Sequence, residues 1–265
     1  MNIYNIDIHG QALSFLSIGT GDPVLFIHAY GLSPNSYLDF IAGLQEGRRF
    51  IVPYLPGIGP SSPLAAYGMD KIATHLDALR EHLGIYSWDI IGHSIGGYIG
   101  VEMLSKYPDT IGRMLFLHSF CFPDSAEKAA SRTKQIEFVQ NHGVMPLMKE
   151  TIMKLFSAEY QNKNVKSFEK ILLDARTFQP EGVSGLLQAM RDRQDHSTTI
   201  SHTDKWIGFI LSENDQAIPL DKSLEQLKLP RRSIVHFIND ATHMSPFESP
   251  EKSSAAINDF LNTKD

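Results

Sequence analysis

Ser94 has the sequence context of an activated serine nucleophile. It lies in Gly92-His93-Ser94-Ile95-Gly96, with glycine two residues before and two residues after the serine. The apolar run 88–91 predicts a strand before this pattern, and residues 95–107 predict a helix after it. A serine on such a tight strand-to-helix turn exposes its hydroxyl, and the flanking glycines avoid collisions with the backbone. The pattern therefore indicates nucleophilic catalysis through an acyl-enzyme intermediate.

A serine hydroxyl needs a base that takes its proton and an acid that orients the base. In the chain order expected for this turn, the acid follows the serine and the histidine comes last. His243 lies in the loop between the last predicted strand and the last predicted helix, whereas His236 lies within that strand. We therefore assign His243 as the base and expect a structural role for His236.

The acid is expected in the loop after the preceding strand, residues 206–211. Asp215 is the preferred residue in this loop, and Glu213 is the alternative. Asp124 is a further alternative because it follows another predicted strand, 114–117, where the acid can also be supplied. The sequence thus favours Asp215 among three carboxylates.

Two backbone N–H groups are expected to stabilise the oxyanion that forms during nucleophilic attack. Ile95 N–H follows the nucleophile directly and opens the predicted helix, whose N-terminus favours negative charge. The second donor should come from the loop after the predicted strand 24–27, which reads His28-Ala29-Tyr30-Gly31. We predict an oxyanion hole formed by the N–H groups of Tyr30 and Ile95.

The elements that would position these residues alternate between strand and helix. Short apolar runs predict strands at 24–27, 50–52, 88–91 and 114–117. Between them, residues 70–83 carry apolar side chains at the spacing of one helix face, and residues 1–16 predict a hairpin joined near His9-Gly10. This alternation predicts a parallel sheet with helices on both faces.

The alternation is interrupted after about residue 123. Residues 124–203 show helical periodicity and no convincing strand, and strands resume at 206–211 and 233–237. A last helix is predicted over 250–261, with Ser249 as its cap and proline at the first helical position. We therefore predict a core of residues 1–121 and 204–265, with an inserted helical cap over residues 122–203.

The composition is that of an ordinary globular protein. The chain has 265 residues, 42% of them apolar, and a formal net charge of −6 without a run of Lys or Arg. Nucleic acid is therefore not an expected partner, and the single cysteine, Cys121, excludes an internal disulfide. No signal peptide is visible, and no apolar segment reaches the ~18 residues that span a bilayer. We expect a cytoplasmic protein without a membrane partner. Because the histidines show no metal-ligand spacing, neither a metal nor a cofactor is expected.

These landmarks resemble the α/β-hydrolase superfamily, and specifically its capped, esterase-like and lactonase-like branch. The matching segments occur in the family's order and cover nearly the whole chain, at 26–31, 55–62, 92–97, 213–219 and 242–250. The resemblance implies a mostly parallel eight-stranded sheet with helices on both faces and an inserted helical cap. It also implies that Ser94, Asp215 and His243 form the catalytic triad, and that His28 braces the oxyanion loop without taking part in chemistry.

Three positions depart from the family pattern. Ala29 stands where glycine is usual and restricts the backbone that aims Tyr30 N–H. Tyr54 stands where an aspartate usually makes a structural hydrogen bond, and Ser212 replaces a frequent glycine near the acid. All three departures bear on the shape of the pocket, and each member of the triad is present.

The triad and the resemblance predict hydrolysis of a small carboxylic ester or lactone. The serine at position 94 excludes the relatives that use an aspartate nucleophile. Carbon–carbon bond hydrolases, cofactor-free perhydrolases and a non-catalytic small-molecule receptor remain alternatives. Candidate apolar substrate contacts are Tyr30, Phe122, Leu155, Phe156 and Met244. Arg191 and Arg193 in the cap are not assigned to the substrate, because charged residues on a helix are usually solvated.

Overall fold

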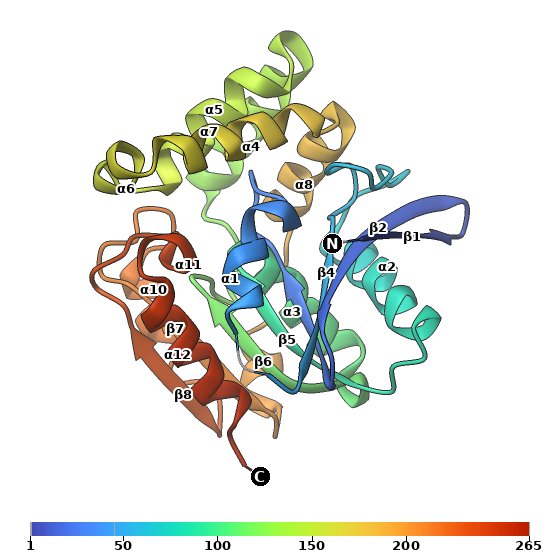
Figure 1. The fold of residues 1–265 in the computed structure, drawn as a ribbon, viewed down its shortest axis with the longest axis vertical. Coiled ribbons are helices and arrows are strands. Elements are labelled where there is room, and N and C mark those ends of the chain that lie inside the picture. The colour runs from blue at the N-terminus through green and yellow to red at the C-terminus, as the bar shows by residue number, and fades with distance from the viewer. Residues whose placement is uncertain (1, 45, 265) are drawn as a thin grey trace.

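The computed structural model describes residues 2–44 and 46–264, which form one sheet covered by helices (Figure 1). The strands are β1 (Ile3–Ile8), β2 (Gln11–Gly19), β3 (Asp22–Ile27), β4 (Arg48–Pro53), β5 (Trp88–His93), β6 (Ile111–Leu117), β7 (Trp206–Leu211) and β8 (Ser233–Phe237). Their order in the sheet is β1-β2-β4-β3-β5-β6-β7-β8. Only β1–β2 and β2–β4 pair antiparallel, so the predicted mostly parallel sheet of eight strands is confirmed.

Helices lie on both faces of the sheet, as predicted. Those that belong to the core are α1 (Leu38–Ala42), α2 (Met69–His82), α3 (Ile95–Lys106), α10 (Leu220–Gln226), α11 (Ser245–Glu248) and α12 (Pro250–Leu261), with 3₁₀ turns η1 (Pro34–Tyr37) and η2 (Pro108–Thr110). Successive side chains of a strand point to opposite faces. Met114 of β6 accordingly lies against Gly100 of α3, whereas Leu115 lies with Phe260 of α12 around Gly208.

The insertion leaves the sheet after β6 and returns at β7. It contains α4 (Ala126–His142), α5 (Val144–Leu155), α6 (Ala158–Lys163), α7 (Val165–Asp174), the turn η3 (Ala175–Thr177), α8 (Pro180–Arg191) and α9 (Ser197–His202). Helices α4 to α8 form a layer at one end of the sheet, seen at the top of Figure 1. Because β6 and β7 are neighbours, the two ends of the insertion lie together, and His196 N–H donates to Cys121 O at 2.9 Å. The assignment of residues 122–203 as a cap domain stays a prediction.

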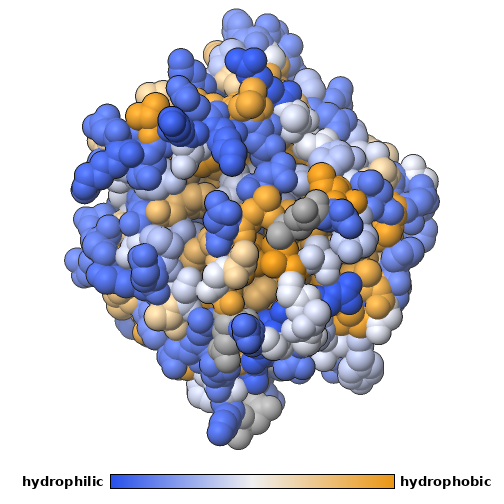
Figure 2. All heavy atoms as spheres, in the orientation of Figure 1, coloured by the Kyte–Doolittle hydropathy of each residue, from blue (hydrophilic) through white to orange (hydrophobic). Residues whose placement is uncertain are grey.

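The core consists of the apolar strand residues and the helix faces that cover them. β5 is buried along its entire length, and the most deeply buried large side chains include Trp88, Phe26 and Phe116. On the face shown in Figure 2, hydrophilic side chains dominate the periphery, and apolar atoms gather nearer the middle. None of the helices in the described part of the chain is long and apolar enough to span a membrane.

Several elements differ in detail from the sequence-based prediction. α12 begins at Pro250 as predicted, but the Ser249 side chain does not cap it, because its hydroxyl donates to Asp240. The short helices α1, α10 and α11 were not predicted, since four to seven residues carry too little periodicity to distinguish a helix from a loop.

The glycines around Ser94 are required by close backbone contacts. A Cβ atom on Gly92 would lie 2.4 Å from the carbonyl carbon of Gly96, and one on Gly96 would lie 2.3 Å from the oxygen of Ile27. Both neighbours are backbone atoms of buried elements, so they cannot turn away. The strand-to-helix turn therefore depends on the absence of these side chains.

We predict that Gly92→Ala destabilises the protein by about 2 kcal/mol or more, because overpacking a buried backbone contact cannot relax locally. Urea unfolding measured by circular dichroism provides the test. Gly43→Ala is the matched control, since its Cβ would meet only ordinary contacts at 3.5 Å and its φ of −88° suits alanine. Equal stability of the Gly92→Ala variant and the wild type would contradict the prediction.

Candidate active site

Ser94 occupies the turn between β5 and α3 in a strained backbone conformation. Its φ is 55° and its ψ is −114°, a combination that is uncommon for a residue with a side chain. The turn is held on both sides, since Ser94 N–H donates to Leu117 O at 3.0 Å and Ser94 O accepts from the Ser119 hydroxyl at 2.7 Å. The neighbouring strand β6 thus fixes the backbone of Ser94.

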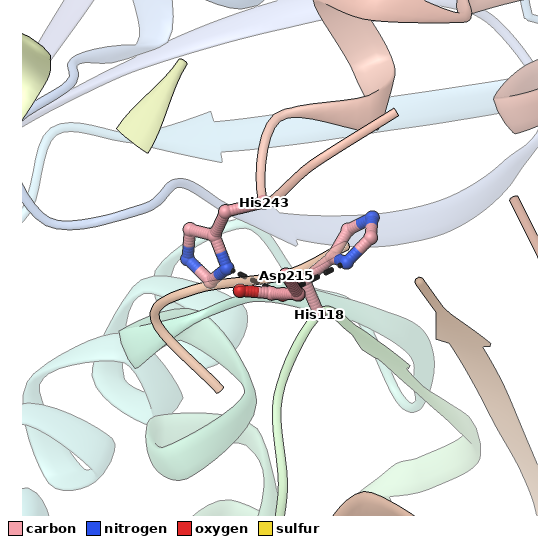
Figure 3. Close-up of side chains that lie close together, drawn as sticks. All are labelled: His118, Asp215 and His243. Atoms are coloured by element: carbon pink, nitrogen blue, oxygen red, sulfur yellow. Dashed lines mark hydrogen bonds and ion pairs between the residues drawn. The ribbon is translucent and has the colours of Figure 1, made fainter. Parts of the chain in front are cut away.

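His243 and Asp215 form a hydrogen-bonded pair. Asp215 lies in the loop that follows β7, and His243 lies in the loop that follows β8. His243 Nδ1 lies 2.8 Å from Asp215 Oδ2, and both side chains are almost completely buried (Figure 3). The other carboxylate oxygen, Oδ1, accepts the N–H groups of Ala217 at 2.8 Å and Ile218 at 3.0 Å. The structure thus brings together the base and the acid that the sequence favoured.

A second histidine, His118, binds the same carboxylate oxygen. His118 Nδ1 lies 3.1 Å from Asp215 Oδ2 (Figure 3). Its Nε2 lies 2.8 Å from the Ser245 hydroxyl. His118 was not among the residues that the sequence pattern singled out. The one available signal was its position directly after β6, at the same edge of the sheet as Ser94 and Asp215.

The electrostatics of this cluster keep the carboxylate charged. Burial alone would raise the pKa of Asp215, but the neighbouring His243 and His118 outweigh burial and hold this pKa well below its usual range. Burial lowers the pKa of His118, against the attraction of Asp215. A neutral His118 that donates through Nδ1 must accept through Nε2, so the Ser245 hydroxyl is its donor.

The two alternative acids lie elsewhere. Glu213 is exposed, and its backbone N–H donates to Asn239. The Asp124 carboxylate is occupied by two guanidinium groups, since Arg132 binds it and Arg193 Nη1 lies 2.6 Å from its Oδ1. Arg193 is buried and lies over the Tyr98 ring, contrary to the solvated position expected for a charged cap residue.

The loop expected to supply the second oxyanion donor is braced from two directions. His28 Nδ1 lies 2.9 Å from Ala29 O, and its Nε2 accepts Leu55 N–H at 3.2 Å. Burial lowers the pKa of His28 to about 4, so the ring is neutral and can make both bonds. Leu32 N–H closes a turn onto Ala29 O, and this turn requires the positive φ of Gly31.

Ala29 causes no left-handed strain, because the non-glycine residues of the described chain with positive φ are His9, Ser94 and His118. The N–H groups of Tyr30 and Ile95 have no hydrogen-bond acceptor within the described residues. Both are therefore free to bind a ligand, although the oxyanion hole itself stays a prediction.

Tyr37 and His93 connect this loop to His243. Ala29 N–H donates to the Tyr37 hydroxyl at 3.3 Å, and that hydroxyl lies 2.7 Å from His93 Nδ1. His93 Nε2 lies 2.9 Å from the His243 carbonyl oxygen. Because a carbonyl only accepts, His93 carries its proton on Nε2 and accepts from Tyr37. The oxyanion loop, the residue before Ser94 and the base loop thus share one chain of hydrogen bonds.

The remaining departures from the family pattern also have structural partners. The Tyr54 hydroxyl donates to Asn35 Oδ1 at 2.6 Å, so a different hydrogen bond replaces the one expected from aspartate. The Ser212 hydroxyl donates to Ala241 O at 2.6 Å and accepts Asn214 N–H at 3.0 Å. Ser212 therefore joins the loop that carries Asp215 to the loop that carries His243.

A cavity of about 960 Å³ lies between the sheet and the inserted helices. Ser94 and His243 line it, together with Tyr30, Phe122 and Leu155 among the candidate contacts. Phe156 and Met244 do not line it. Met244 was expected to contact the substrate, but the start of α11 turns its side chain into the core, where it is fully buried. His243 Nε2 is buried without a hydrogen-bond partner and is thus available to a group in the cavity.

Among the described residues, the group that could hold a metal ion is the same cluster, His118, Asp215 and His243, whose ligand atoms lie within 4.8 Å of one another. Their hydrogen bonds account for this proximity, since each Nδ1 donates to the shared Oδ2. The three side chains therefore lie close together because one carboxylate accepts hydrogen bonds from two imidazole rings.

Comparisons with known proteins agree with this fold. A model of the α/β-hydrolase fold family matches residues 22–143. A thermophilic esterase from Thermogutta terrifontis, determined with malate bound, is 26% identical with a TM-score of 0.90, covering 98% of each chain. This chain has the α/β-hydrolase fold. An enol-lactonase from Burkholderia xenovorans LB400 shares its fold with a TM-score of 0.90 at 18% identity, over 98% of this chain and 100% of that one.

A similarity in sequence extends over almost the full length of the protein. The 2-hydroxymuconate semialdehyde hydrolase of Pseudomonas sp. strain CF600 is 23% identical over 258 residues, which are 92% of this chain and 88% of that protein. Together with the family match, these relatives support hydrolase activity and a small-molecule substrate for this protein.

Because His28 is buried and neutral, we predict that the protein loses stability in mild acid. Its pKa in the folded protein, about 4, lies below the ordinary value of 6.5, so the unfolded chain takes up the proton first as the pH falls. Between about pH 6.5 and pH 4 this difference amounts to about 3 kcal/mol. Urea unfolding over this range should therefore show a smaller loss for His28→Asn than for the wild type. Parallel curves would refute the assignment.

Tyr37→Phe should lower the free energy of unfolding by about 2–4 kcal/mol, because each buried polar group left without a partner costs about 1–3 kcal/mol. The two groups concerned are Ala29 N–H and His93 Nδ1. Tyr86→Phe is the matched control, since Tyr86 is 86% exposed and should change stability little. If the two variants unfold at the same urea concentration, the proposed chain of hydrogen bonds does not stabilise the protein.

Proposed function

We propose that this protein is a serine hydrolase that cleaves a small carboxylic ester or lactone through an acyl-enzyme intermediate. The observation that carries the proposal is the unpartnered Nε2 of His243 at a cavity that Ser94 also lines. The Nδ1 of the same ring is bound to Asp215, so Nε2 is the nitrogen left to act as a base.

The chemistry follows from this arrangement. The Ser94 hydroxyl attacks the substrate carbonyl while His243 Nε2 takes its proton, and Asp215 keeps Nδ1 protonated and stabilises the imidazolium. The N–H groups of Tyr30 and Ile95 bind the oxyanion of the tetrahedral intermediate. His243 then protonates the leaving alkoxide, and water activated by the same histidine releases the acid.

The relatives support the substrate class. The protein from Thermogutta terrifontis is an esterase with malate bound, and that from Burkholderia xenovorans is an enol-lactonase. Esters and lactones both present a carbonyl carbon that a serine nucleophile can attack. The cavity of about 960 Å³ is of a size that accommodates small molecules. Apolar side chains such as Phe120, Phe122 and Leu155 line part of it and fit an acyl or alkyl group, and charged side chains line the rest.

Hydrolysis of a carbon–carbon bond is the second candidate. The full-length similarity to 2-hydroxymuconate semialdehyde hydrolase favours it, because that alignment includes the inserted helices as well as the core. The same catalytic residues would serve, since the carbonyl carbon is again the electrophile. Turnover of a ring-fission dienoate, compared with a short ester, distinguishes the two candidates.

Ser94→Ala should lower kcat for a short p-nitrophenyl ester by about 10⁴-fold or more and abolish labelling by a fluorophosphonate. Ser131→Ala is the matched control, because Ser131 also lines the cavity but lies on the exposed side of α4. It should keep both activity and labelling. Unchanged turnover by purified Ser94→Ala would refute the proposed nucleophile, and a wild type without turnover or labelling would favour a receptor.

A further inference from the structure

Asp215 uses one oxygen atom for two imidazole rings. Oδ2 accepts from His243 Nδ1 at 2.8 Å and from His118 Nδ1 at 3.1 Å, while Oδ1 is occupied by the N–H groups of Ala217 and Ile218. The carboxylate therefore has four N–H donors, and it cannot rotate without breaking at least one of these hydrogen bonds. The ring of His118 supplies the one donor of the four that comes neither from the base nor from the acid's own loop.

The position of His118 is unfavourable in two respects, its burial and its backbone conformation. Its side chain is completely buried, and its backbone has a φ of 48°, a left-handed conformation that a bulky side chain rarely adopts. Its N–H donates to Ile210 O at 2.9 Å, which ties the end of β6 to β7. The strain places the ring beside Asp215 and behind the cavity, which His118 does not line. His118 is therefore too far inside the protein to touch a substrate.

The Ser245 hydroxyl determines which nitrogen of His118 carries the proton. It lies 2.8 Å from Nε2, and Nδ1 must be the protonated atom because the carboxylate can only accept. Ser245 is itself fully buried at the start of α11, two residues after His243. Ser245, which follows His243 closely in the chain, thus also fixes the tautomer of His118.

We propose that His118 is a positioning residue of the reaction, which holds the Asp215 carboxylate through the oxygen shared with His243 and thereby sets the pH range in which His243 acts as a base. The proposal rests on the proposed function, because it concerns the triad of that reaction. Oδ2 attracts the protonated form of His243 less strongly when it already accepts a second N–H, so the base stays active at lower pH.

Other polar groups lie around the loop of His243 on three elements, and charged groups such as Lys128 line the same cavity. From the end of β5, His93 binds its carbonyl oxygen, and from η1 Tyr37 binds His93. From α11, the Glu248 carboxylate accepts the N–H of Thr242 and acts on His118 through its charge. His118 is the one among these that shares an oxygen of Asp215 with the base.

The test compares His118→Phe, which removes the donor, with His118→Asn, whose side-chain amide can replace Nδ1–H. The pH dependence of kcat/KM for a short p-nitrophenyl ester is measured per active site, with active sites counted by fluorophosphonate labelling. His196→Phe is the matched control, because His196 is another nearly buried histidine that pairs with a carboxylate, Glu102 at 2.9 Å, outside the triad.

We expect His118→Phe to move the acid limb of the profile up by about 0.5–1 pH unit and to lower kcat about tenfold or more, with KM changed less than about threefold. His118→Asn should restore the acid limb to within about 0.3 unit of the wild type. His196→Phe should leave the limb unmoved. A purely structural role for His118 would lower the number of active sites without moving the limb, and that outcome would overturn the proposal.

A measurement on the wild type keeps the test decisive if His118→Phe does not fold. Nitrogen-15 NMR of the histidine rings should show His118 neutral and protonated on Nδ1 throughout the pH range of activity. A proton on Nε2 would overturn the proposal. These outcomes are separate from failure of the proposed function, which Ser94→Ala and the labelling reaction test by themselves.

Discussion

A buried carboxylate, Asp215, constrains the site more than any other group. An ionised carboxylate removed from water is stable only when hydrogen-bond donors surround it. Its four donors come from the ends of two parallel strands and the loop after a third, because His118 follows β6, Ala217 and Ile218 belong to the loop after β7, and His243 follows β8. The parallel pairing of these neighbouring strands is thus what makes a charged acid possible at this depth.

A second set of contacts holds the other half of the site. The hydrogen bonds from Ala29 through Tyr37 and His93 reach the carbonyl oxygen of His243. His93 is neutral, because burial and the nearby His243 and His118 hold its pKa well below the usual value. The residue before Ser94 and the loop of the base are therefore held by the same buried groups, which limits how far the two can move relative to one another.

The sequence predicted the alternation of strands and helices and the pairing of His243 with Asp215 because both depend on local patterns. Gly92 and Gly96 identify the turn at Ser94, and strand ends identify the loops that meet there. The contribution of His118 could not be predicted, because it depends on a side-chain direction that a strained backbone sets. Met244 shows the opposite error, since an apolar residue beside the base was expected in the cavity and lies in the core.

The insertion leaves the sheet after β6 and returns to it at the neighbouring strand β7, and His196 N–H donates to Cys121 O where its two ends meet. The ends of a long segment are therefore already close together, so its length adds little to the entropy of closing it as a loop. None of the hydrogen bonds to Asp215 comes from this segment. A change confined to the inserted helices therefore alters the lining of the cavity without removing a hydrogen-bond donor of the buried acid.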